Sequence, residues 1–135
     1  MDFEAFQKAF ADTRNERLAG FAKSKQSFKL PGMDVELHFT KVTDHDNLRI
    51  ASLKKPDDVG ANAFYLASRT KKPDGQKWMF EELDEVIGAA KLLMSLESEY
   101  LNWLVNKVLD DVDGAKDAQK RFDGMVGNSG KAENS

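Results

Sequence analysis

Cysteine is absent from this chain of 135 residues, so disulfide bonds, thiol catalysis and cysteine-ligated zinc are excluded. Histidine occurs only twice, as His38 and His45, which leaves little material for metal binding or acid–base catalysis. No apolar run approaches the roughly 18 residues that a membrane-spanning helix requires. Residues 1–4 also lack the basic and then apolar order of a secretory signal. We therefore expect neither an enzyme nor a membrane protein.

What the chain does contain is apolar material for one core, since 41% of its residues are hydrophobic and 32% are charged. The formal net charge of −3 is unevenly distributed. Residues 23–77 carry eleven Lys/Arg and seven Asp/Glu, whereas residues 78–112 carry two and eight. The basic region could bind nucleic acid, but acidic residues interrupt it and aromatic residues do not alternate with the cations. Solvated surface charge is the favoured interpretation, with the two regions attracting each other.

The N-terminal segment is predicted to form a helix over residues 2–22. Phe3, Phe6 and Phe10 lie at i, i+3 and i+7, which places them on one face. Arginines interrupt this face further along the helix. We therefore assign residues 1–27 to a helical arm that docks loosely or awaits a partner. The three phenylalanines are candidate partner-binding residues.

A β-hairpin is predicted next, because short alternating stretches flank a Pro31-Gly32 turn. The candidate inward positions are Phe28, Leu30, Val35, Leu37 and Phe39.

Three helices are expected between the hairpin and the last helix. Thr43 followed by Asp46 predicts the capped start of a short helix. Residues 61–70 are apolar and favour a buried helix, with a strand as the alternative. An acidic helix is predicted over residues 81–93, after the turn at Asp74-Gly75.

The last helix, residues 96–112, has the clearest periodicity, and Ser95 is its expected N-cap. Leu96, Tyr100 and Trp103 form a second apolar strip on nearly the opposite side from the main one. A helix that is apolar on two sides is either sandwiched within the domain or offers one side to another chain. Because Trp and Tyr are enriched at binding hot spots, this strip is the second candidate partner-binding surface. The main strip, expected to face the core, comprises Leu101, Leu104, Val105, Val108, Leu109 and Val112.

The predicted fold class is therefore α+β and mostly helical: a small hairpin followed by a helical bundle. Residues 28–112 form a single core domain after the N-terminal arm. Residues 113–135 are expected to be a frayed helix and a disordered tail, because they contain few large apolar groups. No catalytic, cofactor-binding or metal-binding constellation is predicted, since the spacings at Asp44-His45-Asp46 and Asp110-Asp111 do not suit an ion site.

This order of features resembles the tail assembly chaperones of long-tailed bacteriophages, through layout and not through a diagnostic motif. The resemblance covers about residues 28–112 and is strongest over residues 64–109. The N-terminal arm has no counterpart in the family pattern. Gly130-Lys131 is compatible with the slippery codons that some members use for a −1 frameshift. The features that carry the resemblance are Val35–Val42, Thr43, Ala63–Arg69, Asp74-Gly75, Phe80 and the terminal amphipathic helix.

The resemblance implies a non-enzymatic protein without a cofactor that acts in the host cytoplasm. Its implied partners are the tape measure protein and the tail tube protein, and self-association is possible. Such a chaperone is not expected in the mature virion. The alternatives are a small structural virion protein, such as a tail-completion or head–tail connector protein, and a nucleic-acid-associated regulator.

Overall fold

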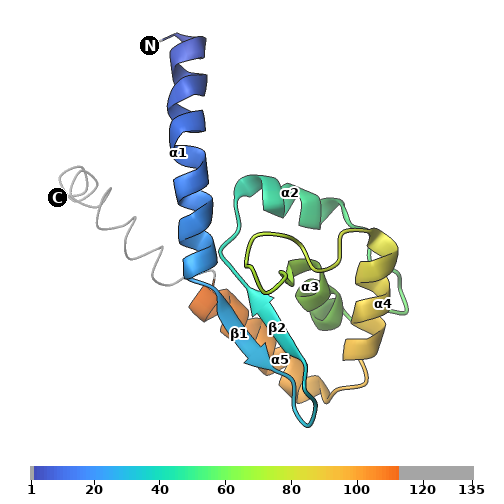
Figure 1. Cartoon of the computed structure of the whole chain (residues 1–135). Helices are drawn as coiled ribbons and strands as arrows, with labels where there is room; N and C mark the ends of the chain where they lie inside the picture. The colour runs from blue at the N-terminus through green and yellow to red at the C-terminus, as the bar shows by residue number, and fades with distance from the viewer. Residues whose placement is uncertain (1, 113–135) are drawn as a thin grey trace, which may run out of the picture.

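The computed structural model describes residues 2–112, and these residues are mostly helical with one β-hairpin (Figure 1). This arrangement confirms the predicted α+β, mostly helical class. In chain order the elements are α1 (Phe3–Lys23), β1 (Gln26–Lys29), β2 (Glu36–Phe39), α2 (Asp44–Ser52), α3 (Ala61–Arg69), α4 (Leu83–Leu93), α5 (Ser98–Lys107) and the π-helix η1 (Val108–Val112).

Helix α3 is the buried centre of the domain and packs against both α4 and α5. Ala63, Leu66 and Ala67 are almost completely buried on one face of this helix, and Phe64, Ser68 and Arg69 are buried on its other sides. A helix that is buried on several sides needs several neighbours, and α4 and α5 are two of them. The helical prediction for residues 61–70 is confirmed over the strand alternative.

The hairpin is a two-stranded antiparallel sheet in which Phe28 is opposite Leu37. Leu37 and Phe39 are buried, and Phe28 packs half-buried against the core. Val35 was expected to point inward but is exposed. Val35 lies in the loop before β2, and its carbonyl accepts a hydrogen bond from the Leu30 N–H. Because it precedes the strand, the alternation of side chains along β2 does not determine where the Val35 side chain points.

Of two predicted helix caps, one is confirmed and the other is wrong. The Thr43 hydroxyl accepts from the Asp46 N–H at 3.2 Å, and the Asp46 carboxylate accepts from the Thr43 N–H at 3.0 Å, which confirms the capping box. The expected N-cap at Ser95 is wrong. The Ser95 hydroxyl donates to the Leu92 carbonyl at 2.7 Å and so belongs to the end of α4, while Glu97 precedes the first residue of α5.

The main apolar strip of the last helix faces the core except at its end. Leu109 is exposed, which corrects the prediction, and Val105 is only half-buried. Leu109, unlike Val105, lies in the π-helix that begins at Val108. A π-helix has more residues per turn, so the spacing that points a side chain inward in an α-helix no longer does so. The strip members that are buried are Leu101, Leu104, Val108 and Val112.

Helix α1 projects from the domain and touches it near its C-terminal end (Figure 1). None of its residues is buried. The contact is with the turn at Gly75, where an added Cβ would lie 3.2 Å from the Ala22 Cα. The Lys25 ammonium also donates to the Pro73 carbonyl at 2.6 Å. Since β1 begins at Gln26, the predicted arm boundary at residue 27 falls inside the first strand.

The frayed helix and tail predicted for residues 113–135 lie outside the described residues, as does Gly130-Lys131.

Candidate partner-binding surface

Helix α5 has one buried face and one partly exposed aromatic face. Leu104 is completely buried, whereas its neighbour Trp103 is 47% exposed. Leu96 and Tyr100, the other members of the second strip, are half-buried and pack against the core. Leu96 was predicted on the helix but precedes it, because α5 begins at Ser98. The members of the strip therefore have two roles. Leu96 and Tyr100 stabilise the domain, and Trp103 is partly exposed at the surface.

Trp103 belongs to an aromatic cluster that joins α5 to the hairpin. Its ring is 5.7 Å from the Tyr100 ring and 6.4 Å from the Phe28 ring, centroid to centroid. Phe28 in turn lies 6.0 Å from the buried Phe39. Such tilted and edge-on contacts are favourable aromatic geometries. We call Phe28, Phe39, Tyr100 and Trp103 the aromatic cluster.

The aromatic cluster holds Trp103 in place while leaving about half of it in solvent. Burial raises the pKa of the Tyr100 hydroxyl. The Lys107 ammonium lies 6.0 Å from the Trp103 ring and forms an ion pair with the Asp111 carboxylate at 3.3 Å. An exposed, pre-positioned indole suits contact with an apolar partner.

The second predicted surface, on α1, is separate from the first. Phe3, Phe6 and Phe10 are 72%, 49% and 58% exposed, and the Phe6 and Phe10 rings are 4.8 Å apart. These residues occupy the half of α1 that projects away from α5 and the hairpin (Figure 1). The structure therefore does not bring the two candidate surfaces together into one site.

A cluster of cations around Trp78 was missed from the sequence. The Lys71 ammonium lies 3.7 Å from the Trp78 ring centroid and the Arg49 guanidinium carbon 4.5 Å from it. Arg49 also donates to the carbonyls of Phe80 at 2.8 Å and Ser68 at 3.3 Å. It therefore ties α2 to α3 and to the segment before α4.

The backbone at Lys71 extends the hairpin. It forms antiparallel bridges with His38 on one side and with Trp78 on the other. Burial lowers the pKa of the Lys71 ammonium, and desolvation likewise lowers that of Arg49. The turn signal at Asp74-Gly75, with Lys71 and Trp78 on its two sides, could have indicated this second, very short pairing.

Several cations of the basic region, residues 23–77, are part of the packed domain. Arg69 is almost completely buried and donates to the Tyr65 hydroxyl at 2.7 Å and the Thr40 carbonyl at 3.1 Å. Lys71 is also buried, and Arg49 is half-buried. Three of the eleven cations of residues 23–77 thus hold the domain together instead of forming a surface for phosphates. This observation disfavours the nucleic-acid alternative.

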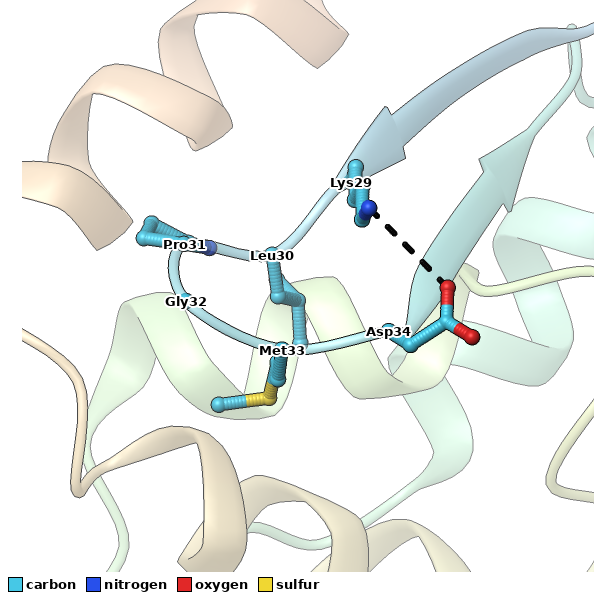
Figure 2. A pocket seen from close by; sticks show the side chains of 6 residues that line it. All are labelled: Lys29, Leu30, Pro31, Gly32, Met33 and Asp34. Carbon is cyan, nitrogen blue, oxygen red and sulfur yellow. Dashed lines mark ion pairs between the residues drawn. The ribbon is translucent and has the colours of Figure 1, made fainter.

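A shallow hollow lies at the tip of the hairpin (Figure 2). Leu30 and Met33 extend from the loop in the same direction, and Lys29 forms an exposed ion pair with Asp34 at 4.0 Å. All lining residues belong to the end of β1 and the loop that follows it, so side chains from distant elements do not converge here. The hollow lacks the arrangement that small-molecule sites have. Its lining residues are Lys29, Leu30, Pro31, Gly32, Met33 and Asp34.

Residues 2–112 contain neither a metal-binding cluster nor a membrane-spanning helix. No group of three or more His, Asp or Glu side chains in this part of the chain could hold a metal ion. No helix in the described part combines the length and apolar character that crossing a membrane demands.

Comparison with protein-family models, with curated proteins and with solved structures found no match. The aromatic cluster and α1 are consequently interpreted from their own chemistry.

Proposed function

We propose that this protein is a non-enzymatic tail assembly chaperone of a long-tailed bacteriophage. In this proposal it binds the tape measure protein and helps to recruit tail tube subunits in the host cytoplasm, and it is absent from the mature virion. The layout of residues 28–112 supports the proposal through its resemblance to that family. The observation that carries it is Trp103, which the aromatic cluster fixes in position while 47% of its surface remains exposed.

The physical requirements of such a chaperone agree with this surface. A tape measure protein is long and apolar, and it must be shielded before the tube is built around it. One exposed indole provides a small contact, which can be released when tube subunits arrive. Many copies bound along one long partner gain avidity although each contact is weak.

The test is to follow the protein through tail assembly. Lysates of infected cells are fractionated, and the protein is quantified in tail intermediates and in purified particles by mass spectrometry. We expect it to co-purify with the tape measure protein before the tube is complete and to be scarce in mature particles. Stoichiometric recovery from mature virions would contradict the proposal and favour a structural virion protein instead.

A further inference from the structure

Ser27 and His38 form a hydrogen-bonded pair of a hydroxyl and an imidazole across the hairpin. The two residues are directly opposite each other in the antiparallel ladder, and the Ser27 Oγ lies 2.8 Å from the His38 Nδ1. Ser27 is exposed, whereas only 9% of the surface of His38 is exposed. The pair therefore joins a hydroxyl that a small molecule can reach to an imidazole that the packed domain holds in place.

The imidazole partner distinguishes Ser27 from three other exposed serines. The hydroxyls of Ser24, Ser52 and Ser95 each donate to the backbone carbonyl of the residue three positions earlier. A carbonyl oxygen accepts a hydrogen bond but does not take up a proton at neutral pH. A neutral imidazole nitrogen is a base in this pH range, and an adjacent base is what activates a weakly nucleophilic hydroxyl.

The backbone of Ser27 leaves its own N–H available on the outer side of β1. The Leu30 N–H donates to the Val35 carbonyl, and in an antiparallel pair the backbone groups of every second residue face the partner strand. Those of Ser27, three positions before Leu30, consequently face away from β2. The same alternation turns the His38 carbonyl away from β1, where it accepts from the Lys71 N–H at 2.7 Å. In the described part of the chain no strand pairs with the outer side of β1, so the Ser27 N–H can stabilise an oxyanion formed at this residue.

We propose that Ser27 is a nucleophile, that His38 acts as its general base, and that Ser27 accepts an acyl group from an activated ester. The Ser27 Oγ attacks the carbonyl carbon of the ester while its proton passes to the His38 Nδ1. The bond between Oγ and the carbonyl carbon forms, and the bond from that carbon to the leaving oxygen breaks. The leaving group takes the electron pair, and the imidazole then releases the proton to the leaving group or to water. The product is an ester at Ser27.

This inference goes beyond the proposed function and does not depend on it. Successive residues of a strand point to opposite faces, and the side chain of Phe28 contacts Trp103. Ser27 therefore lies on the other face of the hairpin from the aromatic cluster. Acylation of Ser27 and capture of a partner by Trp103 can each fail without the other.

Acetylation by p-nitrophenyl acetate tests the proposal in the full-length protein. Samples are quenched with acid at successive times, and peptide mass spectrometry locates the acetyl groups. Hydroxylamine separates an ester at a serine, which it cleaves, from an amide at a lysine, which it leaves intact. We expect an ester at Ser27 to form about a hundredfold or more faster than one at Ser52, the matched exposed serine without an adjacent base.

Two substitutions separate the nucleophile from the base. Ser27→Ala removes the acceptor and should leave acetylation of the lysines unchanged. In His38→Asn the amide oxygen can still accept the Ser27 hydrogen bond near the position of Nδ1, but it cannot take up the proton. This variant should slow the formation of the Ser27 ester about a hundredfold. Circular dichroism and thermal unfolding check the fold of both variants, and the comparison of Ser27 with Ser52 requires only the wild type.

The tautomer of His38 provides a measurement that does not involve acylation. Action as a general base requires that Nδ1 of the neutral imidazole be free of hydrogen, with the proton on Nε2. Long-range proton–nitrogen correlation NMR of the wild type distinguishes the two tautomers, and we expect the one with the proton on Nε2. A neutral ring protonated at Nδ1, a Ser27 ester that forms no faster than one at Ser52, or an undiminished rate in folded His38→Asn would each overturn the proposal.

Discussion

The indole ring of Trp103 meets the ring of Phe28 edge-on, with the two centroids 6.4 Å apart and the planes at 89°. This contact links α5 to the first strand of the hairpin, two elements far apart in the sequence. It also fixes the direction in which the exposed part of the indole points. Trp103 thus contacts Phe28 and also exposes part of its ring to solvent. The effect of a substitution on stability and its effect on partner binding can therefore be measured separately.

The first prediction compares Trp103 with the adjacent Leu104. Leu104→Ala removes a completely buried side chain and should lower the free energy of unfolding by about 2–5 kcal/mol. Trp103→Ala loses ring contacts worth about 1 kcal/mol beyond the area they bury, and should cost less than Leu104→Ala because 47% of its surface is already exposed. Urea denaturation followed by far-ultraviolet circular dichroism measures both. Equal losses in the two variants would mean that Trp103 is an ordinary core residue.

The second prediction concerns the turn that supports α1. Gly75 has a φ of +72°, and a Cβ there would lie 3.2 Å from the Ala22 Cα and 3.3 Å from the Thr40 Cγ2. Gly75→Ala should therefore destabilise the protein by more than the roughly 1–2 kcal/mol that the left-handed backbone alone costs.

Gly32→Ala is the matched control for this substitution. Gly32 has the same φ of +72°, but nothing lies within 4 Å of its added Cβ. Thermal unfolding should show a clearly smaller loss for Gly32→Ala than for Gly75→Ala. Equal losses would contradict the close packing of α1 against the turn.

The third prediction is a pH dependence that originates at Lys71. Because burial lowers the pKa of its ammonium in the folded protein, the unfolded chain, with an ordinary pKa of 10.5, binds more protons between the two values. The stability contributed by Lys71 should therefore rise as the pH increases through this window towards 10.5.

Lys71→Met keeps the aliphatic contact with Trp78 and removes the titrating group. The difference in unfolding free energy between wild type and this variant, measured at several pH values from neutral to alkaline, isolates Lys71 from Tyr100, whose raised pKa acts in the opposite direction. A difference that does not change with pH would show that the Lys71 ammonium is not desolvated.

Local signals in the sequence predicted most of the fold correctly. The capping box of α2 needs two residues three positions apart, Thr43 and Asp46, and both take their expected roles. The Ser95 error has the same local origin, because a serine between two helices can bond to the end of the first or cap the second. The exposure of Leu109 depends on the π-helix, which an α-helical period cannot predict.

The sites were harder to predict because they depend on distant residues. The second apolar strip identified Trp103 and Tyr100 correctly as neighbours, since they share one helix. Their contact with Phe28 depends on how the hairpin packs on α5. The Trp78 cluster likewise brings together Arg49, Lys71 and the end of α3, and no local pattern relates these residues.

The most direct test of the proposed function measures capture of the tape measure protein encoded in the same genome. Full-length wild type, Trp103→Ala and Leu92→Ala are each co-expressed with it, and the complex is quantified after affinity purification. Leu92, on α4, is the matched control because it is 76% exposed and so even more accessible than Trp103. The account predicts capture by wild type and Leu92→Ala, with a loss of about tenfold or more for Trp103→Ala, as for a hot-spot tryptophan. Equal capture by all three proteins, or capture by none, would contradict it.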